Sequence, residues 1–268
     1  MSERDPLLDA ILASGVVLPT LDGTMLKLRT LAADEETSPA QLAAAVGRDP
    51  ALTGEFIRVA NSPVVRTRTP ARSVKAAITI LGRTKTLAVI TSSALRRQFV
   101  GIAPKAVEAI WAGSVVAADN AYRAAQASRL RSLADLAYLA GLVHDAGLAV
   151  VLHRYPAQAP LLEDLADKPD AAAFALDAAT RTDHAAIGSL VARNWKLPPE
   201  VIEAVLLHHQ PSAAEHAEPH AASLATLVAV GRRLRDGPSD EWAAWAPLAE
   251  THLGLDEQAI KKLAGDLF

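Results

Sequence analysis

The chain has 268 residues, of which 50% are hydrophobic and 21% are charged, and its formal net charge is -3. This mixture is too apolar for a disordered chain and too often interrupted by charge for a membrane bundle, and the length allows one large domain or two small ones. Cysteine is absent, which excludes disulfides, thiol nucleophiles and metal sites with Cys ligands. Aromatic residues make up only 4%, and the apolar content is dominated by Ala, Leu and Val, which favours helices over strands.

The first residues, MSERDP, carry acidic side chains and a proline where a signal peptide would need a basic segment. We therefore expect no export signal and a cytoplasmic protein. A helix is also expected within residues 1–15. The most apolar segment, Leu136 to Leu152, is broken by His144 and Asp145, so no membrane span is expected.

Short capped helices are predicted in the first hundred residues. Residues 38–41 (SPAQ) form a capping box with proline at the first helical position, and the helix that they open ends at Gly47. Residues 49–50 (DP) start a second helix in the same way. Ser73 caps a third helix, and Gly82 is expected to end it.

Longer apolar helices follow, after a joint at residues 101–104 (GIAP). The sequence shows no alternating strand pattern and no fixed repeat, so the fold class is predicted to be all-α. The further helices are expected over residues 84–99, 104–127, 133–152, 158–165, 171–180, 184–195, 199–209, 221–234, 241–253 and 256–267.

Charge is distributed unevenly along the chain. Between Glu55 and Glu108 there is no acidic residue, and the 17 basic residues outside this stretch face all 30 acidic ones. Because solvated surfaces normally mix both signs, we interpret the stretch as a binding surface, against the alternative of an ordinary solvated face. Its ten basic residues are Arg58, Arg66, Arg68, Arg72, Lys75, Arg83, Lys85, Arg96, Arg97 and Lys105.

An imidazole and a carboxylate, His144 and Asp145, interrupt the most apolar predicted helix. Burying either group alone is costly, so the pair must be hydrogen-bonded, ion-paired or bound to a metal. Further histidines follow at His184, His208 and His209. His and Asp without Cys would suit Mn, Fe or Mg better than a structural zinc. The competing interpretation is a polar pair that is satisfied inside the protein without a metal.

An ordered set of segments from about Val16 to Pro211 resembles the HDOD domain family. No single motif is decisive, but the order of the set is specific. The segments are residues 18–21 (LPTL), 48–53 (RDPALT), 60–63 (ANSP), 76–82 (AAITILG), 141–147 (GLVHDAG), 183–184 (DH), 195–198 (WKLP) and 208–211 (HHQP). We accordingly predict an N-terminal helix over residues 1–15, an HDOD domain over 16–215 with parts at about 16–100 and 101–215, and C-terminal helices over 216–268 that pack on or extend it.

The resemblance implies a bacterial, all-helical signalling module, an offshoot of the HD phosphohydrolases that generally lacks hydrolase activity. In active HD enzymes an early His, a His-Asp pair and a late Asp hold the metal. The resemblance places the pair at His144 and Asp145, but Gly113 stands where the early His is expected, and residues 223–230, where the late Asp is expected, contain no carboxylate. We therefore predict no catalytic residues, and no cofactor beyond a residual divalent metal. That residual site would draw on His144, Asp145, His184, His208 and His209.

The favoured hypothesis is a stand-alone regulatory protein that binds a signalling protein in trans or an anionic effector. The competing hypothesis is a divergent metal-dependent phosphohydrolase acting on a nucleotide or cyclic dinucleotide. Nucleic-acid binding is disfavoured, because the chain is acidic overall and the basic stretch offers few aromatic side chains for stacking. The residues expected to bind the partner or anion are Arg66, Arg68, Arg72, Lys75, Arg83 and Lys85.

Overall fold

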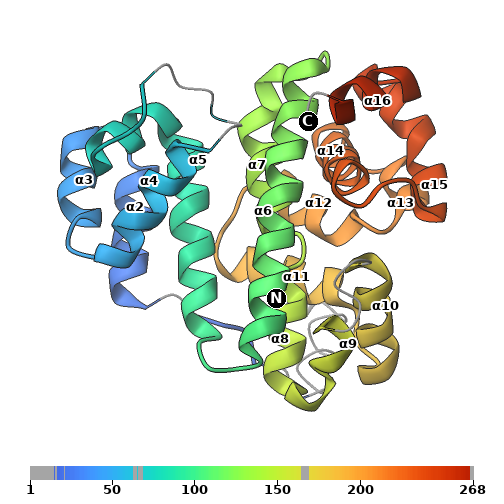
Figure 1. Ribbon diagram of the computed structural model, residues 1–268, viewed down its shortest axis with the longest axis horizontal. Helices are drawn as coiled ribbons and strands as arrows, with labels where there is room; N and C mark the ends of the chain where they lie inside the picture. Colours follow the sequence, from blue (N-terminus) through green and yellow to red (C-terminus); the bar gives the residue numbers. More distant parts are fainter. Residues whose placement is uncertain are drawn as a thin grey trace, which may run out of the picture. The chain divides into compact units, whose positions relative to one another are not determined.

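The computed structural model describes residues 15, 17–20, 22–62, 65, 69–163 and 169–265, and within these ranges the chain forms helices and no strand (Figure 1). The predicted all-α class is confirmed. The predicted N-terminal helix and the residues Arg66 and Arg68 lie outside the described residues. By its internal contacts the chain divides into a smaller unit, Leu21–Gln98, and a larger unit, Met1–Thr20 with Phe99–Phe268. The boundary predicted from the sequence lies two residues later, between residues 100 and 101.

The smaller unit contains helices α2 (Gly23–Ala33), α3 (Pro39–Val46), α4 (Pro50–Ala60) and α5 (Val74–Gln98). The capping box at Ser38 is present as predicted, and the side chain of Asp49 accepts from the amide of Leu52 at the start of α4. Helix α2 was not predicted; the side chain of Asp22 caps it. Local hydrogen bonds of short polar side chains therefore set where these helices begin.

Gly82 interrupts α5, as the sequence predicted. Its φ of 69° lies in the left-handed region, which glycine adopts without a steric penalty, and a second helical segment continues beyond it. The expected stop at Gly82 and the expected new helix after it are therefore both present, joined across a kink.

The larger unit is built around α7 (Ala134–Val143), α6 (Pro104–Ala127) and α14 (Pro219–Asp236). Two glycines allow these helices to approach closely. A Cβ added at Gly141 would lie 2.6 Å from the Cα of Ala118, and one added at Gly231 would collide with the carbonyl oxygen of Ala117. The other helices are α8 (Ala146–Arg154), α9 (Pro160–Glu163), α10 (Pro169–Thr180), α11 (His184–Asn194), α12 (Pro199–Leu207), α13 (Pro211–Ala214), α15 (Asp240–Leu248) and α16 (Glu257–Gly265), with short turns at Arg131–Leu133, Pro156–Gln158 and Ala249–Leu253.

The single helix predicted over residues 133–152 is wrong, because the chain turns at His144 and Asp145 and forms α7 and α8 instead. The stretch from Arg131 to Arg154 is the one helical stretch among the described residues that is long and apolar enough to cross a bilayer, and 89% of its apolar window is buried inside the protein. Core helices of folded proteins share this property.

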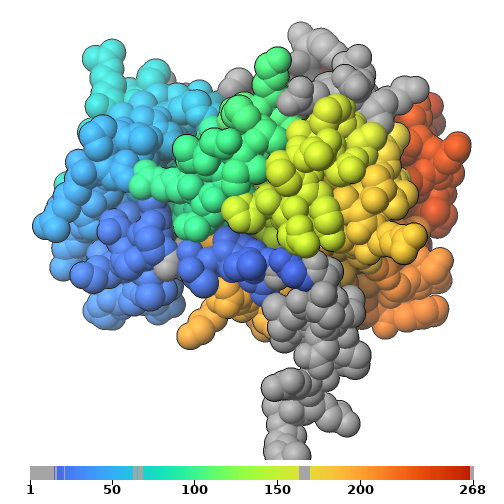
Figure 2. Space-filling model, turned by 90° about the horizontal axis from the view of Figure 1, so that it is seen from below, coloured from blue at the N-terminus to red at the C-terminus, as the bar shows by residue number. Residues whose placement is uncertain are grey.

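Tryptophan side chains are buried in the larger unit. Trp195 and Leu197 lie in the core as predicted, and the indole of Trp195 donates to the carbonyl oxygen of Pro19 at 2.8 Å. Trp242 and Trp245 are also buried, so the C-terminal helices pack on this unit. On its surface, the end of α8 and helix α10 adjoin each other, in yellow-green and yellow in Figure 2.

Candidate metal centre

Four helix ends bring the predicted His and Asp residues together in the larger unit. His144 and Asp145 form the turn between α7 and α8, His184 begins α11, and His208 and His209 follow the end of α12. A Cβ at Gly147 would collide with the carbonyl oxygen of His184, so this glycine allows the start of α8 to contact the start of α11. That contact places His184 beside Asp145.

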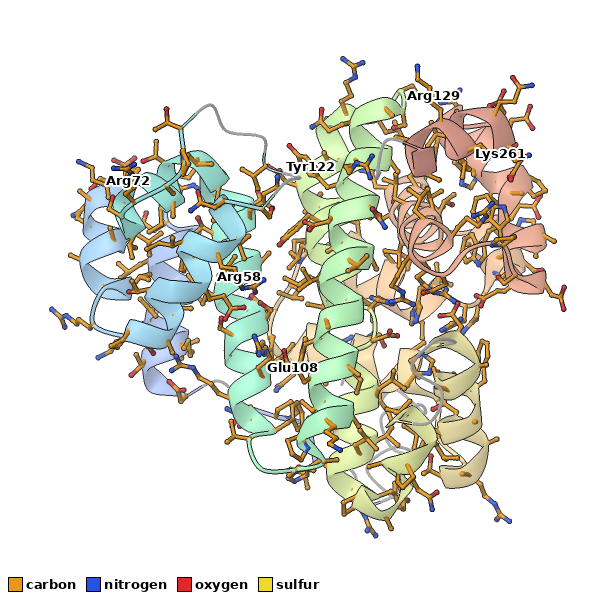
Figure 3. The ribbon with its side chains drawn as sticks, viewed as in Figure 1. Arg58, Arg72, Glu108, Tyr122, Arg129 and Lys261 are labelled. Carbon is orange, nitrogen blue, oxygen red and sulfur yellow. The ribbon has the colours of Figure 1, made fainter. Side chains whose placement is uncertain are left out.

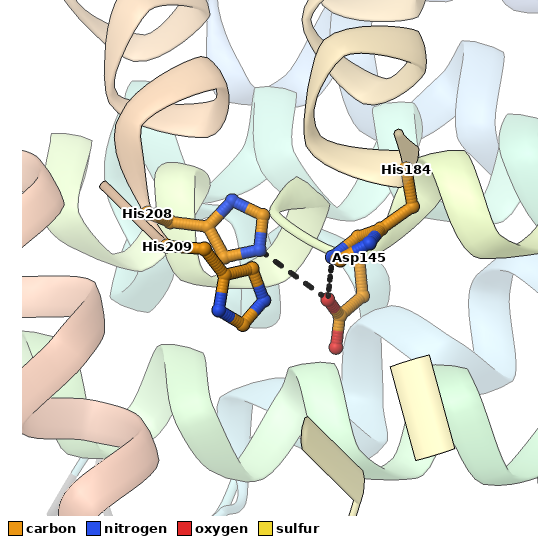
Figure 4. Close-up of side chains that lie close together, drawn as sticks. All are labelled: Asp145, His184, His208 and His209. Atoms are coloured by element: carbon orange, nitrogen blue, oxygen red, sulfur yellow. Dashed lines mark ion pairs between the residues drawn. The ribbon is translucent and has the colours of Figure 1, made fainter. Parts of the chain in front are cut away.

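One carboxylate lies at the middle of the cluster (Figure 4). Oδ1 of Asp145 is 3.7 Å from Nε2 of His184 and 3.6 Å from Nε2 of His208, and Oδ2 is 3.0 Å from Nε2 of His144. One ligand atom each from Asp145, His184, His208 and His209 lies within 4.8 Å of the others. His144 stands outside this set of four, on the other carboxylate oxygen.

The cluster is enclosed by protein. His144 and His208 are 0% exposed, His184 is 1% exposed and Asp145 is 7% exposed. Buried polar groups are stable only when they are partnered, so every nitrogen and oxygen in this set needs a hydrogen bond, an ion pair or a metal ion.

The outward-facing nitrogens of three imidazoles have such partners. Nδ1 of His144 lies 2.7 Å from the carbonyl oxygen of Gly141, and Nδ1 of His208 lies 2.6 Å from that of Val205. Nδ1 of His184 lies 2.6 Å from a carboxylate oxygen of Asp177 on α10. Because carbonyl and carboxylate oxygens only accept, each Nδ1 carries a proton, and each neutral ring keeps its lone pair on Nε2.

The inward-facing nitrogens face the carboxylate of Asp145. Nε2 of His144, His184 and His208 is buried and lacks a hydrogen-bond partner among the described residues. A lone pair facing a carboxylate oxygen is repelled by it, whereas a cation between them would satisfy both. Metal-binding histidines typically donate their other ring proton to a carbonyl or carboxylate, as here, so the residues present fit a divalent metal ion.

Electrostatics favour the charge states that metal ligands need. Burial raises the pKa of Asp145, but the positive charge and the hydrogen bonds that the neighbouring imidazoles supply when they are protonated outweigh burial and hold that pKa well below its usual range. Burial lowers the pKa of His208 to about 4, and burial with the charges of His208 and Arg232 holds the pKa of His209 well below its ordinary value. The carboxylate is thus ionised and these two rings are neutral at pH 7.

His184 differs from the other rings. Burial lowers its pKa, but the hydrogen bond to Asp177 and the charge of Asp145 outweigh burial, so the pKa of His184 is raised. Without a metal this ring holds a proton more readily than His208 or His209, and a bound cation would displace that proton.

A buried guanidinium, which the sequence analysis missed, borders the cluster. Arg232 on α14 is 4% exposed and donates to the carbonyl oxygen of His208 at 2.8 Å, to Oε2 of Glu241 at 2.7 Å and to Oδ1 of Asp170 at 3.1 Å. These two carboxylates raise its pKa above the ordinary value for arginine, against the effect of burial. The sequence does contain a feature that could have indicated a buried Arg232, because this arginine directly follows the mostly apolar residues 221–231.

Arginines also border the positions where the two missing ligands were expected. A Cβ at Gly113, the position of the expected early His, would lie 3.2 Å from a guanidinium nitrogen of Arg235. Helix α14, which follows His209 and was expected to supply the late Asp, instead presents Arg232 to His208 and His209. Two cations therefore border the positions from which an active HD enzyme draws ligands.

The predicted basic surface is only partly available for binding. In the smaller unit, Lys85 is 5% exposed, and the guanidinium of the exposed Arg83 donates to the carbonyl oxygens of Ala32, Asp34 and Glu35. Lys85 is therefore buried, contrary to the expectation that it lies on a binding surface, whereas Arg83 stays exposed with its donors bound to backbone carbonyl oxygens. Arg72 and Lys75 are exposed, and Figure 3 shows Arg72 at the edge of this unit.

Other members of the basic stretch have acidic partners within the same unit. Arg97 pairs with Asp49 at 2.5 Å, and Arg58 and Arg96 both pair with Glu55. Three of the ten basic residues of the stretch are therefore paired in the fold with carboxylates that precede it in the sequence.

Comparisons with known proteins agree with this architecture. A family model of the HDOD domain matches residues 18–211. A crystal structure of an HDOD domain protein from Geobacter sulfurreducens has a TM-score of 0.70 at 23% identity and covers 98% of this chain and 92% of its own.

Two further solved structures have the same fold. A protein from Shewanella amazonensis, provisionally named a metal-dependent phosphohydrolase, has a TM-score of 0.65 at 20% identity, covering 98% of this chain and 97% of its own. A Marinobacter aquaeolei protein, provisionally named for signal transduction, has a TM-score of 0.68 at 23% identity and covers 96% of this chain and 58% of its own. No curated protein matches the chain.

Proposed function

Because this chain belongs to the HDOD domain family, we propose that it is a regulatory protein of signal transduction that acts by binding, with one divalent metal ion held in its buried cluster. The observation that carries the proposal is the set of three buried Nε2 atoms without a hydrogen-bond partner among the described residues, which converge on the ionised carboxylate of Asp145.

The donor set indicates the class of metal. Asp145, His184, His208 and His209 would supply one carboxylate oxygen and up to three imidazole nitrogens. Imidazole suits Zn, Fe, Ni and Cu, whereas Mg prefers oxygen ligands alone. We therefore propose Zn²⁺ or Fe²⁺, whereas the sequence alone had favoured Mn, Fe or Mg over a structural zinc. When bound, such an ion would act as a Lewis acid toward any group that reached it.

Burial and the bordering arginines favour a binding role over hydrolysis. A hydrolytic metal needs an open coordination position for water and access for a substrate. Here the candidate ligands are enclosed, and Arg232 and Arg235 border the positions of the two missing ligands.

The metal site is tested on full-length protein purified without chelators. We expect about one equivalent of Zn or Fe by elemental analysis, and one Zn²⁺ site by calorimetric titration after the bound ion has been removed. Asp145→Asn should weaken Zn²⁺ binding at least tenfold, because it removes the central charge. His216→Ala, at an exposed histidine outside the cluster, is the matched control and should leave binding unchanged. Failure of the unmodified chain to bind any of these metals would refute the site.

The second candidate function is a divergent phosphohydrolase, which the His/Asp cluster and the provisional name of a structural neighbour favour. It predicts metal-dependent release of p-nitrophenol from bis(p-nitrophenyl) phosphate, with loss of the activity in Asp145→Asn. Binding of metal without turnover would support the regulatory function instead.

The partner is proposed to bind in trans at the exposed basic residues of the smaller unit, because complementary charge speeds encounter and selects partners. Reversing Arg72 and Lys75 to Glu together should release at least one protein that co-purifies from the native host. Arg131 and Lys261, exposed residues of the larger unit, form the control pair for charge reversal. If every partner stays bound to the Arg72/Lys75 variant, the assignment of this surface fails.

A further inference from the structure

Two residues around the cluster lie outside the segment that matches the family, residues 18–211. Glu241 is in the first turn of α15, and Arg232 is on α14. Oε1 of Glu241 lies 2.8 Å from Nδ1 of His209, and a guanidinium nitrogen of Arg232 lies 3.2 Å from the same Nδ1. The C-terminal helices therefore touch one of the candidate metal ligands directly.

These two neighbours impose opposite positions on the imidazole proton. A carboxylate only accepts, so Glu241 holds the neutral ring of His209 with its proton on Nδ1 and its lone pair on Nε2. A guanidinium only donates, so Arg232 alone would hold the proton on Nε2. Figure 4 shows that the second ring nitrogen of His209, which is Nε2, is turned toward Asp145. Only the arrangement set by Glu241 lets this nitrogen bind a metal.

Glu241 also occupies the competing donor. Its carboxylate accepts from two guanidinium nitrogens of Arg232 at 2.7 Å and 3.2 Å, and Asp170 pairs with one of the same two nitrogens, Nη2, at 2.7 Å. Removing Glu241 would therefore do two things. It would take away the acceptor for Nδ1 of His209, and it would free a guanidinium donor at the same nitrogen.

The other imidazoles of the cluster do not depend on α15. His184 is held by Asp177 on α10, and His144 and His208 by carbonyl oxygens of their own helices. Among the described residues, His209 is thus the one histidine of the cluster whose Nδ1 acceptor comes from beyond residue 211. On its other side the ring packs against Phe174 of α10, with 4.6 Å between ring centroids.

We propose that the docking of α15 through Glu241 sets His209 as a metal ligand, so that metal binding and the docking of α15 strengthen each other. This inference rests on the metal site proposed above. Glu241 acts as a positioning residue, since it reaches the metal site only through His209. Because coupling between two sites is reciprocal, anything that pulls α15 away weakens metal binding by the same factor by which metal strengthens docking.

Calorimetric titration of full-length, metal-free protein with Zn²⁺ tests this coupling. Glu241→Ala should weaken Zn²⁺ binding about 10–100-fold, the usual effect of losing the hydrogen-bond partner of a metal-bound histidine. Glu241→Gln, whose amide oxygen can still accept from Nδ1, should recover part of this loss. Asp240→Ala changes the exposed neighbouring carboxylate of the same turn and is the matched control, with affinity within about twofold of the unmodified chain.

Hydrogen exchange of the unmodified chain supplies a second readout that needs no variant to fold. Zn²⁺ should slow amide exchange across Asp240–Leu248, in addition to any protection at the cluster itself. Equal Zn²⁺ affinity in the unmodified chain and Glu241→Ala, with exchange of α15 unchanged by Zn²⁺, would overturn the coupling and leave the metal site standing. Absence of Zn²⁺ binding in the unmodified chain would overturn both. If Glu241→Ala does not fold, the exchange measurement alone decides.

Discussion

The basic stretch of the smaller unit and the histidine cluster of the larger unit differ in how many of their polar atoms find hydrogen-bond or ion-pair partners in the fold. Arg83 and Arg97 look unpaired in the sequence, yet in the fold they bind backbone carbonyls and Asp49. Several histidines look like ordinary core residues, yet three of them leave buried nitrogens without a hydrogen-bond partner in the described part of the chain. A run of charged residues in the sequence is therefore weaker evidence for a binding site than buried polar atoms that lack hydrogen-bond partners in the fold.

The largest expected effect on the free energy of unfolding comes from removing Arg232, a buried charge that has ion-pair and hydrogen-bond partners in the fold. Arg232→Met would leave Asp170, Glu241 and the carbonyl oxygen of His208 without their buried donor. Breaking a buried ion-pair network in this way costs about 3–5 kcal/mol in free energy of unfolding. Urea denaturation of the metal-free protein measures it, with Arg72→Met at an exposed position as the control. A loss below about 1 kcal/mol would show that the network does not stabilise the larger unit.

The buried histidines of the cluster predict that the stability of the metal-free protein depends on pH. The pKa of His208 is lowered to about 4 in the fold and is about 6.5 when unfolded, so between these values only the unfolded chain takes up the proton. The contribution of His208 to stability is then complete above about pH 6.5 and falls by about 3 kcal/mol as the pH drops to 4, and the lowered pKa of His209 acts in the same direction. The raised pKa of His184 acts oppositely, since its contribution is lost as the pH rises above 6.5.

Denaturation at a series of pH values between 4.5 and 7.5 checks this dependence. The slope below pH 6.5 should shrink in His208→Asn and stay unchanged in His216→Ala. Stability that rises as the pH falls from 6.5 to 5 would contradict the assignment of a buried, neutral His208.

Close backbone contact is what assembles the cluster, and Gly147→Ala tests it. The added methyl group would collide with the carbonyl oxygen of His184 and force α8 and α11 apart, at a cost of about 1–3 kcal/mol. The same variant should weaken Zn²⁺ binding, because Asp145 and His184 lie on either side of this contact. Gly54→Ala, in α4 with open space around it, is the control and should stabilise the protein by about 0.5–1 kcal/mol. Equal unfolding midpoints for the two variants would contradict the prediction.

The smallest expected effect lies in the smaller unit. Arg83→Ala removes the donor for three carbonyl oxygens at and beyond the end of α2, and it should cost about 1 kcal/mol. Arg72→Ala, at an exposed position, should stay within about 0.5 kcal/mol of the unmodified chain. If both variants behave alike in thermal unfolding, Arg83 is free to bind a partner after all, and the contrast between the two regions weakens.

Local chemistry was predictable from the sequence, and long-range pairing was not. The caps at Ser38 and Asp49 and the break at Gly82 involve residues within one turn, and their roles follow from residue type. Helix α2 escaped prediction, because its buried side chains are only Met25, Leu28 and Ala32, which make a weak apolar pattern.

The same division holds in the candidate metal centre. His144, Asp145, His184, His208 and His209 could be selected from the sequence, and the structure brings them together. Their partners Asp177 and Glu241 could not be selected, because a carboxylate near a helix end is indistinguishable in sequence from a capping or surface residue until the fold places it beside an imidazole. The turn between α7 and α8 was hidden for a similar reason, since its apolar flanks continue the helical pattern.

X-ray absorption at the zinc K-edge, on full-length protein loaded with one equivalent of Zn²⁺, reports directly on whether the buried cluster binds the metal. We expect nitrogen and oxygen ligands at about 2.0–2.2 Å, with the multiple-scattering signature of at least two imidazoles, and loss of that signature in Asp145→Asn. A spectrum of water ligands without imidazole scattering, unchanged in Asp145→Asn, would contradict it.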